Sequence, residues 1–177
     1  MTKSVRLAQA LGLFALVGMG CNGGGSDNDG PYAQLTGEWE YVTAMENVKC
    51  MGKNSMGVAV SSDDNSTVKG SIISLKAGLD APVIMLDGAP CPVRFDVAGS
   101  MLTSRPAQSC ETIDEDVQDP ASGLFTTTIT IDSIRISVNG NNAMETTTIK
   151  QAGRANKSPA SIDCTLTRNG TLKKVAP

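Results

Sequence analysis

Short stretches with a period of two residues dominate the chain from residue 32 onward. Val93, Phe95 and Val97 alternate with polar residues, and so do Ile134 and Ile136. Such alternation places the apolar side chains on one face and predicts strands that are buried on one side. The predicted strands cover residues 36–42, 67–75, 82–86, 93–97, 124–131, 134–138, 144–150, 162–168 and 171–175. No stretch after residue 30 keeps a helical period, so we expect an all-β domain.

Turn signals separate these strands. Asn139-Gly140 stands between residues 134–138 and 144–150, and Asn169-Gly170 stands between residues 162–168 and 171–175. Asn-Gly favours the positive φ of a tight hairpin turn. Many short, Thr-rich strands joined in this way predict an antiparallel meander. We expect it to close into a barrel, with a β-sandwich of two packed sheets as the alternative.

The first residues have a different pattern, which predicts export. Lys3 and Arg6 precede an almost continuous apolar stretch over residues 7–17. That stretch is well short of the roughly 20 residues that span a bilayer, so a cleaved signal peptide over residues 1–20 is the better interpretation. Residues 21–31 are rich in Gly, Asn, Ser and Asp and predict a flexible tether. Residues 32–177 then form a single antiparallel β domain.

Gly18-Met19-Gly20-Cys21 ends the predicted signal with small residues just before a cysteine. This segment resembles the lipobox of bacterial lipoproteins, although Gly18 stands where the usual pattern has Leu. The resemblance implies lipid on Cys21 and a protein anchored in the bacterial cell envelope, at the outer membrane. Anchoring by two or more acyl chains is stable because each buried CH₂ contributes about 0.8 kcal/mol. An ordinary secretory signal with a free Cys21 is the alternative.

Charge and composition exclude several classes of function. The formal net charge of −3 becomes −5 when Lys3 and Arg6 leave with the signal. An acidic domain without a basic stripe is not expected to bind nucleic acid or anionic lipid surfaces. The chain has no histidine, which excludes His-based triads, His metal sites and His proton shuttles. We therefore expect no enzyme, no metal site and no cofactor.

The cysteines predict two disulfides. Besides Cys21 the chain has Cys50, Cys91, Cys110 and Cys164, an even number in an exported protein and without the close spacing of a zinc site. We predict the pairs Cys91–Cys110 and Cys50–Cys164, because closure of the sheet would make the first and last strands neighbours. The alternative pairs, Cys50–Cys91 and Cys110–Cys164, would suit a sandwich.

Gly37-Glu38-Trp39 opens the first predicted strand. It resembles the G-x-W opening of lipocalin-like barrels, which implies a Trp at the closed bottom of the barrel and a small apolar ligand inside it. The T-D-Y type segment that lipocalins have in mid-chain has no counterpart here. Met45, Met51, Met56 and Met85 are expected to pack in the core, with the lining of a ligand cavity as the alternative.

The strongest charge cluster is Glu111–Asp119, with five acids in nine residues. Calcium needs six to eight oxygens in a defined geometry, and this segment lacks the spacing and the glycine of an EF-hand. We therefore predict a solvated acidic loop after Cys110. Asp63-Asp64 is interpreted as a turn.

These features predict a membrane-anchored, disulfide-stabilised lipoprotein of non-catalytic type that binds a small apolar ligand. One alternative is a contact module for another envelope protein. Another is a hydrolase that uses Glu111 with Asp114 or Asp116, which requires that burial or a like charge separate the two pKa values. A deep apolar pocket would favour the ligand, a filled interior would favour the contact module, and facing carboxylates in a cleft would favour catalysis.

Overall fold

The computed structural model describes residues 32, 34–77, 82–86, 91–115 and 123–175. The predicted signal, Cys21 and the tether lie outside this part of the chain. The described residues form one antiparallel sheet whose strands are β1 (Gly37–Lys53), β2 (Ala59–Val68), β3 (Ile72–Ala77), β4 (Pro82–Leu86), β5 (Cys91–Ala98), β6 (Met101–Ser104), β7 (Gln108–Glu115), β8 (Leu124–Asn139), β9 (Asn142–Ala155) and β10 (Ser161–Lys174).

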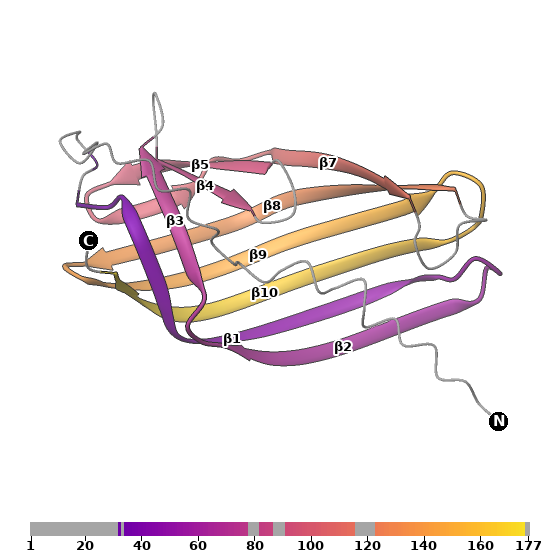
Figure 1. The fold of residues 1–177 in the computed structure, drawn as a ribbon, viewed down its shortest axis with the longest axis horizontal. Helices are drawn as coiled ribbons and strands as arrows, with labels where there is room; N and C mark the ends of the chain where they lie inside the picture. Colours follow the sequence, from indigo (N-terminus) through magenta and orange to yellow (C-terminus); the bar gives the residue numbers. More distant parts are fainter. Residues whose placement is uncertain (1–31, 33, 78–81, 87–90, 116–122, 176–177) are drawn as a thin grey trace.

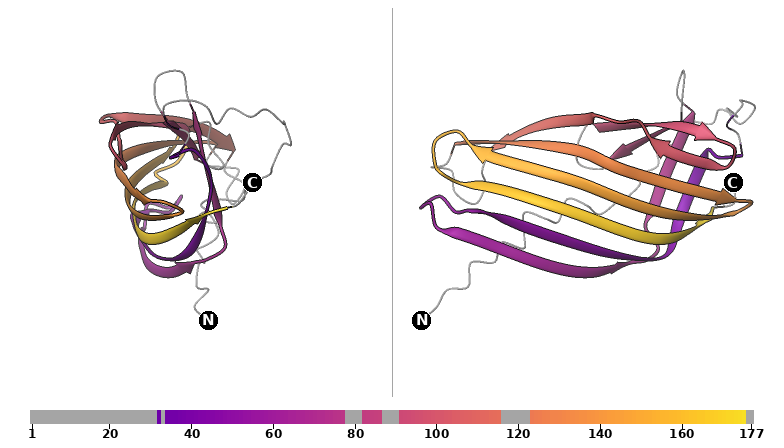
Figure 2. Two further views of the ribbon diagram at one scale, coloured as in Figure 1. Left: turned by 90° about the vertical axis from the view of Figure 1, so that its left-hand side faces the viewer. Right: turned by 180° about the vertical axis from the view of Figure 1, so that it is seen from behind.

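The hydrogen bonds of the sheet run around a closed ring of eight strands (Figures 1 and 2). The ring passes through β1, β3, β4, β5, β6, β8, β9 and β10 and returns to β1, whereas β2 pairs with β1 and β7 pairs with β8 outside it. The predicted all-β, antiparallel class is confirmed. There is one continuous sheet in place of the two packed sheets of a sandwich.

Two long strands change partner part-way along their length. The first residues of β1 pair with β3 and its later residues pair with β2. Between Tyr41 and Thr43, the register of β1 against β10 shifts. In the same way β8 pairs first with β7 and then with β6, and shifts register against β9 between Ile131 and Ser133. Such bulges bend a strand. We call β3, β4, β5 and β6, with the segments of β1, β8, β9 and β10 that lie beside them, the closed half. The remaining segments of β1, β8, β9 and β10, together with β2 and β7, form the open half.

Packed side chains fill the interior of the closed half. Trp39, Tyr41 and Phe95 are fully buried there, and the Trp39 Nε1–H donates to the carbonyl of Leu35 at 3.2 Å. The fully buried aliphatic residues of the same core are Leu35, Leu75, Leu102, Leu172 and Val93. Each such side chain contributes roughly 1.5–3 kcal/mol when it leaves water. The alternation over residues 93–97 therefore identified the buried face of β5 correctly.

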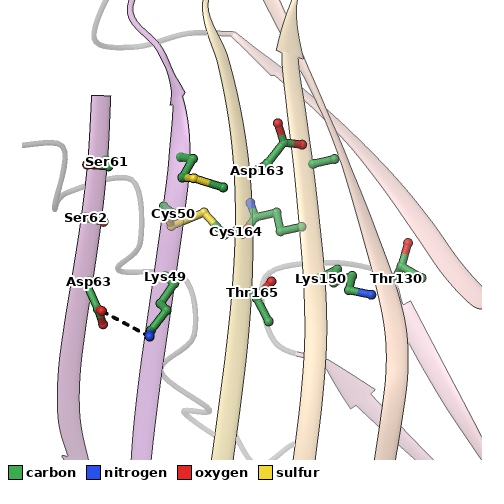
Figure 3. A pocket seen from close by; sticks show the side chains of 13 residues that line it. Lys49, Cys50, Ser61, Ser62, Asp63, Thr130, Lys150, Asp163, Cys164 and Thr165 are labelled. Atoms are coloured by element: carbon green, nitrogen blue, oxygen red, sulfur yellow. Dashed lines mark ion pairs between the residues drawn. A yellow bond between two sulfur atoms is a disulfide. The ribbon is translucent and has the colours of Figure 1, made fainter. Parts of the chain in front are cut away.

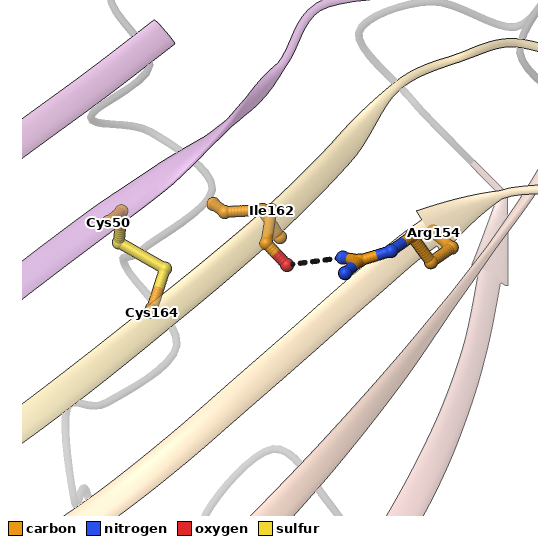
Figure 4. Close-up of a disulfide and its surroundings, with 4 residues drawn as sticks. All are labelled: Cys50, Arg154, Ile162 and Cys164. Carbon is orange, nitrogen blue, oxygen red and sulfur yellow. Dashed lines mark hydrogen bonds between the residues drawn. A yellow bond between two sulfur atoms is a disulfide. The ribbon is translucent and has the colours of Figure 1, made fainter. Parts of the chain in front are cut away.

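The structure contains the two cysteine pairs that the sequence predicts. Cys50 and Cys164 occupy directly paired positions on β1 and β10, the first and last strands (Figure 4). The other disulfide, Cys91–Cys110, joins the first residue of β5 to β7. The prediction that the first and last strands become neighbours is confirmed, since β1 pairs with β10 from Trp39–Lys174 to Lys53–Ser161.

Two predictions that involved glycine were wrong. Residues 67–75 do not form one strand, because Gly70 has a φ of +75° in the turn between β2 and β3. Conversely, Asn169-Gly170 is not a turn and lies inside β10. A Cβ at Gly170 would lie 2.5 Å from the Cβ of Ala44 on β1, so this glycine allows the two strands to approach closely. The Asn139-Gly140 turn between β8 and β9 is confirmed, with a φ of +58° at Gly140.

Other corrections concern polar segments and methionines. Asp63-Asp64 lies inside β2, not in a turn, and Cys110–Glu115 belongs to strand β7, not to a loop. Residues 116–119 of the predicted acidic loop lie outside the described chain. Met45, Met51 and Met56 are exposed instead of packing in the core, because the first two occupy outward positions of β1 and the third lies in the turn after it. The side chain of Met85 is not among those described.

The direction of the peptide groups along β2 follows from two independent observations. The Cα atoms of Cys50 and Cys164 are 4.1 Å apart, which is typical of a non-hydrogen-bonded antiparallel pair, so the peptide groups of Cys50 point toward β2. In the turn, the Asn54 N–H donates to the Val58 carbonyl at 3.0 Å, so the peptide groups of these two even-numbered residues also point toward each other. Even-numbered residues of β2 therefore turn their peptide groups toward β1, and odd-numbered residues turn theirs away.

This phase predicts opposite outcomes for proline at two adjacent serines of β2. Ser62, which pairs with Cys50, should lose a ladder hydrogen bond on substitution, so Ser62→Pro should cost roughly 2–4 kcal/mol. Ser61→Pro removes an N–H that points away from β1 and should cost less than about 1 kcal/mol. Urea unfolding of both variants measures the difference, and equal costs would show that the deduced phase is wrong.

Candidate functional site

A shallow groove of about 870 Å³ lies on the open half, across β2, β1, β10, β9 and β8 (Figure 3). Most of its lining side chains belong to two neighbouring outward-facing rows of the sheet. One row consists of Asp63, Lys49, Thr165, Lys150 and Thr130, and the other consists of Ser61, Met51, Asp163 and Ala152. The alternation of the strands explains this composition, because the outward positions that line the groove are polar apart from Met51 and Ala152.

The charges in the groove are balanced by ion pairs. Lys49 lies 3.4 Å from Asp63, and the Asn47 amide donates to the same carboxylate at 2.7 Å. The hydrogen bond from Asn47, together with Lys49, holds the pKa of Asp63 below its ordinary value. Across the groove, Lys150 pairs with Asp132 at 2.7 Å. The resulting surface carries no excess charge and presents threonine hydroxyls and one exposed thioether.

The floor of the groove is fixed from beneath. The Cys50–Cys164 disulfide lies on the inner side of β1 and β10, between the two rows that line the groove. Next to it, the Arg154 guanidinium links β9 to β10, because it donates to the Ile162 carbonyl at 3.0 Å (Figure 4). It also donates to both Asp163 oxygens at 2.9 Å. The groove therefore has a rigid base, which lowers the entropic cost of binding.

A cluster of ionisable side chains is buried on the inner face of the same strands. Glu145 on β9 accepts hydrogen bonds from the Tyr41 hydroxyl, from Thr147 Oγ1 at 2.5 Å and from Arg168 Nη2 at 3.1 Å. Arg168 on β10 also lies 3.4 Å from Glu46 on β1, and its guanidinium stacks over the Tyr41 ring at 4.9 Å. We call these five residues the buried cluster.

The electrostatics of the buried cluster follow from burial and from its pairs. Burial raises the pKa of Tyr41 far above its ordinary value, and the Glu145 carboxylate raises it further, so the phenol stays neutral. Burial alone would lower the pKa of Arg168, but Glu145, Tyr41 and Glu46 outweigh it and the pKa is raised. The Arg168 Nε–H has no partner among the described residues. The cluster is thus a charged arginine held between two carboxylates.

This arrangement suits a structural role more than a catalytic one. Tyr41, Glu145 and Arg168 are each at most 6% exposed, so a substrate cannot reach them in this structure. Breaking such a pair by removing one partner typically costs 3–5 kcal/mol, because an uncompensated charge stays buried. The groove, and not the buried cluster, is the candidate site for a partner molecule.

Comparisons with known proteins add only remote similarity to solved structures. No protein-family model matches the chain, and no curated protein is significantly similar to it. Among solved structures, the chain is similar to the crystal structure of the ywiB protein from Bacillus subtilis, at 12% sequence identity over 74% of this chain and 92% of that chain. The TM-score is 0.24, which does not establish a common fold.

Of the residues proposed from the sequence for catalysis, only Glu111 has a side chain within the described part of the chain. Glu111 is exposed on β7, where its carboxylate accepts from Thr128 at 3.4 Å. The side chain of Asp114 and all of Asp116 lie outside the described part. Within the described part, no three potential metal ligands gather, and no helix is long and apolar enough to cross a membrane.

Sequence reasoning missed the buried cluster, although a signal was present. Glu145 stands two residues after Ala143 and two before Thr147, in phase with the buried row of β9. Arg168 follows Leu166 in the same way on β10. A charged residue at an inward position of an alternating strand predicts a buried ion pair. The groove had no comparable signal, because it depends on which outward rows the register aligns.

The buried phenol makes the stability of the domain depend on alkaline pH. In the unfolded chain Tyr41 ionises near its ordinary value of 10.0, whereas the folded protein keeps the proton. The contribution of Tyr41 to the free energy of unfolding is therefore fully present below about pH 10. Above that pH it falls by about 1.4 kcal/mol per pH unit. Tyr41→Phe should remove that part of the slope in urea unfolding from about pH 9 to pH 11. Tyr32→Phe is the matched control, and equal slopes in Tyr41→Phe and wild type would contradict the assignment.

Proposed function

We propose that this protein is a bacterial lipoprotein, held in the cell envelope by lipid on Cys21, whose β domain is a non-catalytic module that contacts another envelope protein. In this proposal the groove on the open half provides the contact surface. The signal pattern and the Gly18–Cys21 segment support the anchor.

The filled interior of the closed half is the observation that supports a contact role most strongly. Side chains such as Trp39, Tyr41 and Phe95 occupy the space that an enclosed apolar ligand would need there. Farther along the same interior, the buried cluster places Arg168 and two carboxylates where an apolar ligand would have to lie. A partner therefore has the outer surface available to it.

The position of Tyr32, at the start of the described domain, supports the same arrangement. The tether would join the domain at Tyr32, whose carbonyl accepts from the Leu35 N–H at 2.8 Å, next to the closed half. The tether that the sequence predicts over residues 21–31 would have a root-mean-square length of about 17–20 Å. Lipid on Cys21 would then hold the closed half near the membrane and leave the open half free for a partner.

A small apolar ligand remains the second candidate. Trp39 of the G-x-W segment is buried in the closed half, and Lys174 of the last strand lies over its ring at 5.5 Å. This position is compatible with the resemblance to lipocalin-like proteins, in which the Trp closes one end. A bound apolar molecule in the purified protein would favour this function.

The anchor is tested by Cys21→Ser. We expect the variant to move from the membrane fraction to the soluble envelope fraction, because the thiol that receives the lipid is gone. Fractionation followed by immunoblotting measures the shift, with Ser26→Ala in the tether as the matched control. A variant that stays in the membrane fraction would contradict lipidation.

The choice between the two candidate functions is tested by native mass spectrometry. We expect the Cys21→Ser chain, purified without detergent, to have the mass of the protein alone. Chemical crosslinking in cells should at the same time give a discrete adduct with another envelope protein. A retained apolar molecule and no adduct would favour the ligand-binding function instead.

A further inference from the structure

The outer edge of β2 is open. Among the described residues, β1 is the only strand that pairs with β2. By the phase deduced above, the odd-numbered residues of β2 point their N–H and C=O groups away from β1. Ser61, Asp63, Asn65 and Thr67 thus present a row of donors and acceptors with the spacing that another strand requires.

The same edge carries a carboxylate on each face of the sheet. Asp63 faces outward, in the row that lines the groove, and Asp64 faces the inner side, where β2 is exposed. Asp64 has no ion pair among the described residues, and β2 contains no basic residue. A strand that paired with this edge would therefore meet a carboxylate at two consecutive positions, once on each face. The Asp63 carboxylate is shared with Lys49 of β1, whereas Asp64 has no cation beside it among the described residues.

These charges select the kind of strand that can pair here. Opposite charges at directly facing positions stabilise an antiparallel pair, and like charges destabilise it. A second copy of β2 paired about Asp63 and Asp64 would place carboxylates opposite carboxylates. A segment with two consecutive basic residues would meet an opposite charge on both faces. Because Asp63 also lines the groove, outward side chains of such a segment would lie at the groove rim.

We propose that the free edge of β2 binds an extended basic segment of a partner polypeptide as an additional strand, with consecutive Lys or Arg residues opposite Asp63 and Asp64. This inference rests on the proposed contact function and names the chemistry of the partner. The backbone of the segment hydrogen-bonds to the odd-numbered residues of β2, and its alternate side chains face the groove and the inner side.

The test uses the full Cys21→Ser chain and a fluorescent peptide, Thr-Val-Thr-Val-Lys-Lys-Val-Thr-Val-Thr. The matched peptide has Glu-Glu in place of Lys-Lys. Fluorescence anisotropy should show that the Lys-Lys peptide binds at least about tenfold more tightly. With Asp63→Asn and Asp64→Asn combined, the ratio of the two affinities should approach one.

A second comparison separates strand addition from general attraction between opposite charges. Ser61→Pro removes one edge N–H without changing the charge and should weaken peptide binding about tenfold or more, whereas Ser61→Ala should not. A Lys-Lys peptide methylated on alternate backbone nitrogens should also bind poorly, and this test does not depend on the folding of a variant.

Two results would overturn the inference: no binding of the Lys-Lys peptide, or equal binding by Ser61→Pro and wild type. Self-association through β2 in sedimentation would overturn the choice of partner. A failure of the lipid anchor would leave the peptide measurement unchanged, and a failure of peptide binding would leave the fractionation result unchanged. The two proposals can therefore fail separately.

Discussion

The pairing of β1 with β10 is the contact on which the rest of the structure depends. It joins the first strand to the last, and without it the ring would be an open sheet with two long unpaired edges. The Cys50–Cys164 disulfide fixes this pairing across 114 residues of sequence. Linking positions so far apart restricts the unfolded chain strongly, by about 4–5 kcal/mol in the entropy model. One seam thus positions the aromatic core of the closed half and the floor of the groove.

The buried cluster depends on the same seam. Arg168 on β10 reaches Glu46 on β1 and Glu145 on β9 only when all three strands are in their observed register. A slip of one residue would turn the arginine to the outer face and leave two carboxylates buried together. Buried ion pairs often contribute little net stability compared with apolar packing. Here the cluster disfavours other registers at the point where closed and open halves meet.

The sequence predicted the strands whose two faces differ in polarity. Apolar and polar residues alternate over residues 93–97, and Asn139-Gly140 is typical of a hairpin turn. Strand β5 and the hairpin between β8 and β9 were therefore both predicted. β2 was missed because residues 61–67, which make up most of it, are polar on both faces, so apolar and polar residues do not alternate there. Asn169-Gly170 was mistaken for a turn because the sequence does not show that Ala44 of another strand approaches Gly170.

The candidate site was predicted less well, for a related reason. The Cys50–Cys164 disulfide under the groove was predicted from the even number of cysteines and from the expectation that the first and last strands pair. The groove itself requires Lys49 of β1, Lys150 of β9 and Thr165 of β10 to lie side by side. That alignment depends on long-range register, and the outward residues of such a sheet contribute too little burial energy to reveal it.

The two strands outside the closed ring explain where a partner can bind. A fully closed ring has no edges, whereas the open half has two, β2 and β7, among the described residues. The Cys91–Cys110 disulfide ties β7 to β5 and limits access to that edge. β2 has no such tie, and its charged residues disfavour pairing with a copy of itself. The edge that stays open is also the one beside the groove, so the features that prevent aggregation and those that would select a partner occur on the same strand.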